Sequence, residues 1–78
     1  MRDFPSFNKY VLDIIHEFFP YTTIWQVQGT NKYDLTFELR EQDKKMQYNP
    51  WELYTTNNNE GDAIEGLFNK WNKIREAV

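Results

Sequence analysis

The richest group of chemically distinctive side chains lies in residues 48–62, which read YNPWELYTTNNNEGD. This stretch combines rigid aromatic rings with carboxylates, and residues 51–62 carry a net charge of −3. Aromatic rings beside a polar rim are typical of hot spots in protein interfaces. We therefore predict a site that binds another protein through a basic surface of that protein. The predicted partner-binding residues are Trp51, Glu52, Tyr54, Glu60 and Asp62.

Trp51 has a second interpretation, in which its ring closes one end of a small hydrophobic core. The two interpretations differ in how much of the ring is exposed to solvent. A fully buried ring would remove most of the support for a binding site here. The local sequence leaves both interpretations open.

Residues 56–62, TNNNEGD, invite comparison with a calcium loop, which also strings Asp, Asn and Gly together. With Thr56 at the first position of such a loop, the position that requires a bidentate Glu falls on Leu67. We therefore predict a turn in this segment, and we predict neither a metal nor another cofactor.

No motif in the chain indicates an enzyme. The only histidine, His16, is placed opposite the apolar stripe of a predicted helix, where the helix dipole favours its charged form, so we expect a structural or surface role. Asp34 and Glu38 could serve glycosidase-like chemistry only across a cleft, for which a chain of 78 residues has little room. We predict no catalytic residues.

The composition indicates one compact domain over residues 1–78. The chain is 40% hydrophobic and 18% aromatic, which argues against disorder. It has no cysteine, which excludes disulfides and thiolate sites and fits a reducing compartment. The opening MRDFPSFNKY is too polar for a signal peptide, and no run approaches the roughly 18 apolar residues of a membrane span. We expect a soluble, cytoplasmic protein that does not contact membranes.

Apolar residues at steps of three and four predict a helix over residues 4–19. Asp3 or Ser6 can cap its start, and Pro20 disfavours helical geometry at the residue before it. The predicted apolar stripe consists of Phe4, Phe7, Val11, Ile14, Ile15 and Phe18.

From residue 21 the hydrophobic pattern alternates with the period of a strand. It predicts strands over residues 21–28, 33–40 and 45–49, which form an antiparallel meander with one buried face. Ile24 is predicted on the opposite, outer face. The residues predicted to point at the core are Thr23, Trp25, Val27, Tyr33, Leu35, Phe37, Leu39, Met46 and Tyr48.

Residues 50–56 admit two predictions. Asn49, Pro50 and Glu52 occupy the N-cap, N1 and N3 positions of a short helical turn, whereas WELYTT could also continue as a fourth strand. A last helix is predicted from Asp62, capped by that residue. Gly66 lies inside this helix and is predicted to mark a close contact with the sheet or with another chain. The predicted apolar stripe of this helix consists of Ile64, Leu67, Phe68, Trp71, Ile74 and Val78.

These elements predict an α+β fold of order α-β-β-β-α, a two-layer sandwich in which two helices pack on one face of a three-stranded antiparallel meander. The order resembles that of double-stranded-RNA-binding domains, but the resemblance ends there. Those domains begin their second helix with a basic cluster, whereas this chain has NEGDAIEGL in residues 59–67. We therefore do not expect nucleic-acid binding.

Small acidic domains without chemistry are commonly inhibitors or adaptors, and many are encoded by phages or mobile elements. We therefore expect a non-catalytic protein-binding domain of this kind. The alternative is a self-associating structural or accessory subunit, for example a homodimer, joined through an edge strand or the polar sheet face.

Overall fold

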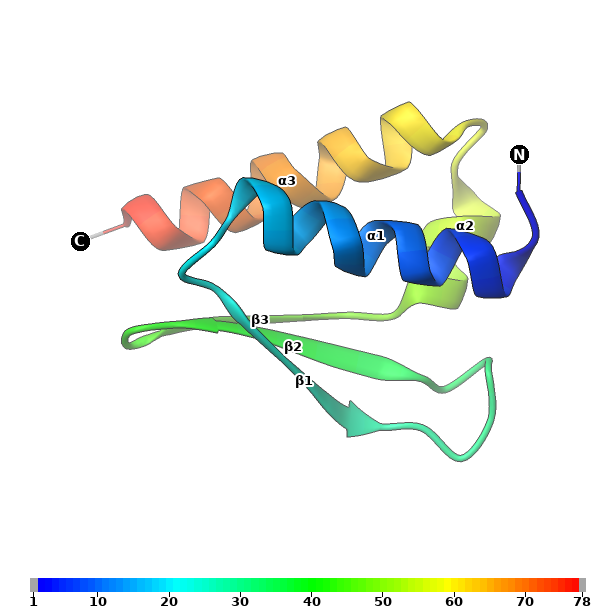
Figure 1. The fold of residues 1–78 in the computed structure, drawn as a ribbon, viewed down its shortest axis with the longest axis horizontal. Helices are drawn as coiled ribbons and strands as arrows, with labels where there is room; N and C mark the ends of the chain where they lie inside the picture. Colours follow the sequence, from blue (N-terminus) through cyan, green and yellow to red (C-terminus); the bar gives the residue numbers. More distant parts are fainter. Residues whose placement is uncertain (1, 78) are drawn as a thin grey trace.

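The computed structural model describes residues 2–77 and has the α+β architecture that the sequence predicts. The strands form one antiparallel sheet of order β1-β2-β3, and the helices lie on one face of it (Figure 1). Residues 50–56 are helical, so the helical alternative for this segment is confirmed. In chain order the elements are α1 (Phe4–Phe18), β1 (Thr23–Gln28), β2 (Thr36–Glu41), β3 (Lys44–Tyr48), α2 (Pro50–Thr56) and α3 (Glu60–Glu76).

The first helix, α1, begins where Asp3 accepts a hydrogen bond from the Ser6 N–H at 2.9 Å. Its inward stripe of Phe4, Phe7, Val11 and Ile15 is buried, as predicted. Phe18 was also predicted to be buried, but its side chain is 63% exposed, and Phe19 is buried in its place. The helix ends at Phe18, and the changed backbone direction at Phe19 turns that ring inward against Phe68, at 4.9 Å between centroids.

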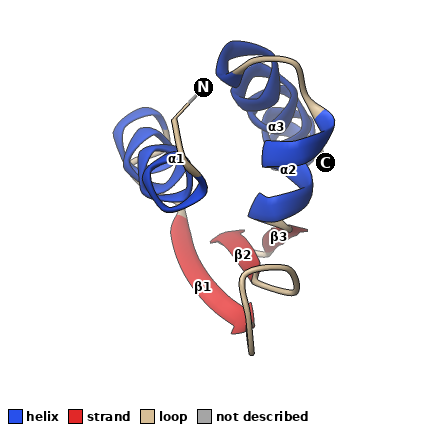
Figure 2. Ribbon diagram, turned by 90° about the vertical axis from the view of Figure 1, so that its right-hand side faces the viewer, coloured by secondary structure: helices blue, strands red, loops and turns tan. Residues whose placement is uncertain are grey.

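The inner face of β2 and β3 agrees with the prediction. Phe37 pairs with Tyr48 and Leu39 pairs with Met46 across the two strands, and all four side chains are buried. In Figure 2, α1 and α3 lie side by side above the sheet, so these residues form the floor of a core that the helices close from above.

The face of β1 that was predicted to point at the core is the outer face. Trp25 is 51% exposed, Val27 is also exposed, and Ile24 instead packs against the core. The cross-strand pairing explains this, because Ile24 lies opposite the inward Leu39 while Trp25 lies opposite Glu38. Directly paired residues share a face of the sheet, so Trp25 must point away from the helices.

Tyr33 is likewise not a core residue, since it is 57% exposed. The second strand begins only at Thr36, so Tyr33 belongs to the preceding loop rather than to the alternating pattern of the strand. Asp34 organises this loop by accepting hydrogen bonds from the backbone N–H groups of Thr30 and Asn31, both at 3.0 Å.

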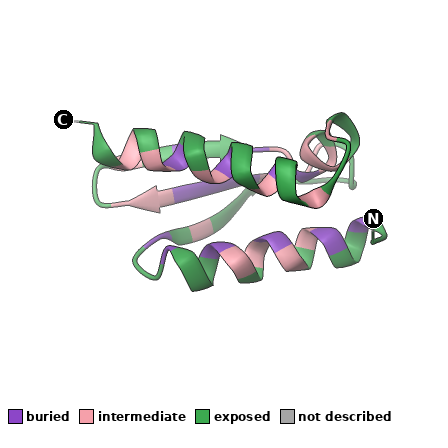
Figure 3. Cartoon of the chain, turned by 90° about the horizontal axis from the view of Figure 1, so that it is seen from above, coloured by how far each residue is buried: buried purple, intermediate pink, exposed green. Residues whose placement is uncertain are grey.

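The N-cap of the last helix, α3, lies three residues earlier than predicted. Asn59, not Asp62, is the N-cap, and its side chain accepts a hydrogen bond from the Asp62 N–H at 2.8 Å. Ala63, Leu67 and Trp71 are buried along one stripe, and Figure 3 shows this stripe and that of α1 on the inner sides of the two helices. Three other predicted stripe members are only partly buried and pack against the core from its sides: Ile64, Phe68 and Ile74. The predicted stripe member Val78 lies outside the described residues.

Glu41 joins three parts of the fold at the far end of the core. Its Oε1 atom accepts hydrogen bonds from the Thr22 hydroxyl and from the Arg75 guanidinium, both at 2.9 Å. The hydrogen bond from Arg75, and a smaller effect from Thr22, lower the pKa of Glu41 from its ordinary value of 4.5, against the opposing effect of burial.

We expect acid to destabilise the fold partly through Glu41. A carboxylate with a lowered folded-state pKa stabilises the fold above its unfolded-state pKa, and this contribution is lost as the pH falls through the folded-state pKa. In urea unfolding at about pH 7 and about pH 3, Glu41→Gln should therefore lose less stability on acidification than the wild type. Part of the loss will remain, because the pKa values of Asp3, Asp34 and Glu38 are also lowered. Equal losses in both proteins would contradict this role of Glu41.

Candidate functional site

Asn49 brings Tyr33 and Trp51 together. Its side-chain oxygen accepts a hydrogen bond from the Glu52 N–H at 3.1 Å and so caps α2, as predicted. Its side-chain amide also donates to the Tyr33 carbonyl at 3.0 Å, which ties the loop before β2 to the start of α2. The rings of Tyr33 and Trp51 then meet edge to face, with centroids 4.9 Å apart.

Four aromatic residues form the end of the molecule where α2 meets the start of α1, and we call this group the aromatic end. Trp51 packs against Phe4 at 5.1 Å and against Tyr54 at 5.8 Å between ring centroids. Its side chain is half-buried, so it covers Phe4 and also presents a surface to solvent. The group consists of Phe4, Tyr33, Trp51 and Tyr54.

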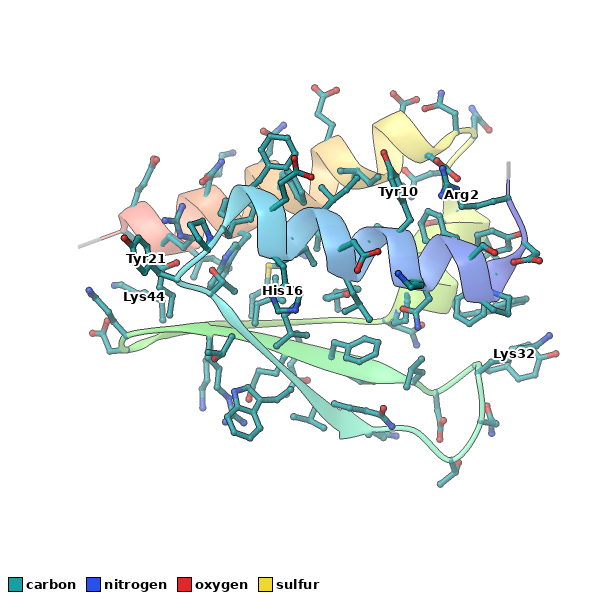
Figure 4. All side chains as sticks on the ribbon, viewed as in Figure 1. Arg2, Tyr10, His16, Tyr21, Lys32 and Lys44 are labelled. Carbon is teal, nitrogen blue, oxygen red and sulfur yellow. The ribbon has the colours of Figure 1, made fainter. Side chains whose placement is uncertain are left out.

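Lys32 adds a positive charge to this surface. Its ammonium nitrogen lies 5.0 Å from the Trp51 ring centroid and 5.2 Å from that of Tyr33, within the range of cation–π attraction. Figure 4 shows Lys32 at the end of the molecule where α1 begins. Lys32 is not among the predicted site residues, because it lies far from the acidic stretch in the chain.

The predicted acidic residues do not form one patch with Trp51. Glu60 makes an ion pair with Arg2 at 2.6 Å, so part of its charge is already compensated within the chain. Asp62 is exposed but belongs to the cap of α3, where its carboxylate accepts a hydrogen bond from the Asn59 amide at 3.0 Å. Glu52 is exposed on α2.

Arg2 connects the two halves of the predicted site. Its backbone carbonyl accepts a hydrogen bond from the Tyr54 hydroxyl at 2.9 Å, while its side chain holds Glu60 and lies over the Tyr10 ring at 4.0 Å (Figure 4). Trp51 and Tyr54 therefore lie together, and Glu60 is linked to them through Arg2. The combination of Arg2 and Lys32 makes this end of the molecule less acidic than the sequence suggests.

A second exposed tryptophan lies on the outer face of the sheet. The Arg40 guanidinium is 4.8 Å from the Trp25 ring centroid and donates a hydrogen bond to Glu38 at 2.6 Å. This hydrogen bond, ahead of the smaller one from Gln47, lowers the pKa of Glu38 although the residue is buried. The predicted polar face thus carries a large aromatic ring. The sequence pattern could not predict which face carries Trp25, because β1 has apolar residues on both faces: Ile24 on one, and Trp25 and Val27 on the other.

A pocket of about 380 Å³ is bounded by β3, α2 and α3. We call it the β3 groove. Glu52 is the only predicted site residue that lines it. Tyr48 also lines it, and the Tyr48 hydroxyl is buried without a hydrogen-bond partner, so burial raises the pKa of this phenol and keeps it protonated.

Neither a metal centre nor a membrane span emerges from residues 2–77. No group of three or more histidine, cysteine, aspartate or glutamate side chains in this range could hold a metal ion. None of the helices in the same range is both long and apolar enough to cross a membrane. The carboxylates of Asp34 and Glu38 belong to separate hydrogen-bond networks, one in a loop and one in a strand.

Comparison of the chain with protein-family models, with curated proteins and with solved structures finds no match. The candidate sites are therefore defined by this structure alone: the aromatic end, the Trp25 face of the sheet and the β3 groove.

We expect Trp51→Ala to lower the free energy of unfolding by about 2 kcal/mol, because it removes a half-buried ring and its edge-to-face contacts with Phe4 and Tyr33. Trp25→Ala should cost less than about 1 kcal/mol, since that ring rests on the outer face of the sheet rather than on the core. Urea unfolding followed by circular dichroism measures both changes. Equal costs would mean that Trp51 contributes no more to the core than Trp25.

Proposed function

We propose that this chain is a non-catalytic domain that binds another protein through the aromatic end. The observation that carries the proposal is the half-exposed pair of Tyr33 and Trp51, held in one geometry by Asn49 and bordered by Lys32. A rigid aromatic anchor with polar residues around it is the composition of an interface hot spot. Because the anchor is already ordered in the free domain, little conformational entropy is lost on binding.

The charge of the surface bears on the kind of partner. Glu52 and Asp62 are exposed carboxylates, whereas Glu60 is shared with Arg2. We propose that the partner presents basic residues to Glu52 and Asp62, and that Glu60 contributes mainly by holding Arg2. The role of inhibitor or adaptor, a phage or mobile-element origin and a cytoplasmic location are part of the same proposal, and they are supported by the small size, acidic charge and lack of cysteine.

A capture experiment tests the aromatic end. The wild type, Trp51→Ala and Trp25→Ala are immobilised in equal folded amounts and exposed to extract of the native host, and the bound proteins are quantified by mass spectrometry. The true partner should bind Trp51→Ala about 30-fold more weakly, the effect of losing a hot spot worth about 2 kcal/mol. Trp25→Ala is the matched control and should retain binding.

Charge reversal separates the acidic residues. Glu52→Lys and Asp62→Lys should each weaken binding to a basic partner and reduce its dependence on salt, whereas Glu60→Gln should have the smallest effect because Arg2 already compensates that charge. A partner that binds the Trp51 and Asp62 variants as tightly as the wild type would show that the aromatic end is not its site.

One observation favours self-association as a second candidate function. Strand β1 lies at an edge of the sheet, and all of its residues except Ile24 are exposed. It contains no charged residue, and charge is the commonest protection of an exposed edge strand. Trp25 and β1 together could therefore form a contact between two copies of the chain.

Sedimentation across about 1–200 µM protein tests this candidate. If copies pair at β1, the wild type should shift toward a dimer with concentration, and Trp25→Glu should remain monomeric because a charge then lies in the contact. Tyr21→Glu is the control, since Tyr21 is 82% exposed but lies outside the strand. A wild type that is monomeric throughout would exclude a micromolar dimer.

A further inference from the structure

The β3 groove has a strand edge as one wall. Its lining includes the consecutive residues Met46, Gln47, Tyr48 and Asn49. Side chains alternate between the two faces of a strand, so consecutive residues can all line one pocket only where the edge of the backbone faces it. Because β3 is the last strand of the sheet, this edge has no neighbouring strand among residues 2–77.

The other walls are single faces of two helices. Helix α3 contributes Ala63, Gly66, Leu67 and Lys70, which are spaced by three and four residues and so form one stripe. Helix α2 contributes Glu52, Leu53 and Thr56, and its C-cap residue Asn57 also lines the groove. The groove therefore lies between the edge of β3 and one side of α3, with α2 at one end. Figures 1 and 2 show how these three elements are arranged.

No contact among residues 2–77 explains why position 66 of α3 is a glycine. Glycine is among the least favourable residues inside a helix, yet Gly66 lies in the interior of the 17-residue α3. A Cβ atom added there would meet no atom within 4 Å, so the predicted close contact with the sheet is excluded. What the missing side chain provides is space in the groove.

The edge of β3 is protected over only part of its length. Lys44 and Lys45 put positive charge at its beginning, a common device against strand pairing. The part that lines the groove, residues 46–49, carries no charge. The groove therefore lies along the uncharged part of the β3 edge, directly after the two lysines.

Charged residues mark the two ends of the groove with opposite sign. Lys70 lies on the third turn of α3, away from α2, whereas Glu52 belongs to α2 itself. Since α3 runs back along β3 from the α2 end, Lys70 lies toward Met46 and Glu52 toward Asn49 (Figure 1). A ligand of matching polarity would carry positive charge near Glu52 and negative charge near Lys70.

We propose that the β3 groove binds an extended segment of a partner protein, which pairs with residues 46–49 as an additional antiparallel strand. In this direction the segment's N-terminal side lies at Glu52 and its C-terminal side at Lys70, so a basic residue followed by an acidic one fits the groove. Residues 46–48 belong to β3, Asn49 continues with extended backbone, and four extended residues span about 14 Å. The inference rests on the proposed protein-binding function and names the form in which the partner is bound.

The probe is a displayed library of random ten-residue peptides, selected on the immobilised wild type. The best peptide is synthesised with a fluorophore, and its affinity is measured by anisotropy. Gly66→Leu should weaken its binding at least tenfold, because the new side chain fills the space beside the strand edge. Asn69→Leu is the matched control, since Asn69 is exposed on the same helix and does not line the groove, and its affinity should stay within twofold of the wild type.

Stability measurements separate the loss of a site from the loss of a fold. Both variants replace a residue by a better helix former, so neither should melt below the wild type. In the complex, hydrogen exchange of backbone amides within residues 46–49 should slow, because an added strand gives them partners. For a peptide with an acidic C-terminal side, Lys70→Glu should weaken the measured binding more than Asn69→Leu does.

Several results would overturn the inference: no peptide selected above background, equal affinity for Gly66→Leu and the wild type, or exchange protection confined to β1. Self-association that Gly66→Leu abolishes would identify a second copy as the occupant instead. The capture experiment repeated with Gly66→Leu separates the two proposals. A native partner lost with Trp51→Ala but retained with Gly66→Leu leaves the protein-binding function standing and removes the groove from it.

Discussion

The orientation of β1 in the sheet depends on the hydrogen bond that the buried indole N–H of Trp71 makes. Trp71 is the largest fully buried side chain, and its indole N–H donates a hydrogen bond to the Thr22 hydroxyl at 3.0 Å. A buried indole N–H without a partner would cost free energy, so the chain that enters β1 must turn Thr22 inward. Alternation then places Ile24 against the helices and Trp25 on the opposite face. One buried hydrogen bond therefore fixes which side of β1 faces the core.

The helices cover only one face of the three-stranded sheet, so other surfaces of the sheet and its ends stay exposed. Helix α2 lies between two of these surfaces, the aromatic end and the β3 groove. Asn49 both caps this short helix and holds the loop of Tyr33, so Trp51 is fixed at the end of the molecule. Leu53, two residues further along α2, lines the β3 groove instead. A helix of seven residues thus separates an aromatic surface from a pocket beside an unpaired strand edge.

Much of the fold could be predicted because its signals are local. The stripes of α1 and α3 follow from helical spacing, and Asn49 followed by Pro50 marks the start of α2. The wrong predictions occur where two residues close together in the sequence are equally suited to the same structural role. Ile24 and Trp25 are both apolar, Phe18 and Phe19 are identical, and Asn59 and Asp62 can each cap a helix. Local preference cannot choose within such pairs, and contacts with distant residues make the choice.

By itself, the sequence determined the order of the first helix, the three strands and the last helix, the inner face of β2 and β3, and the proximity of Trp51 to Tyr54, all of which depend on short-range periodicity. It left open whether residues 50–56 form a helix or a fourth strand. Only the tertiary structure decided that Glu60 is paired with Arg2, 58 residues away, that Trp25 is exposed and that Gly66 opens onto a groove. The physical reason is that charge compensation, exposure and pocket shape are properties of surfaces assembled from several elements. Each depends on which faces the core has already buried.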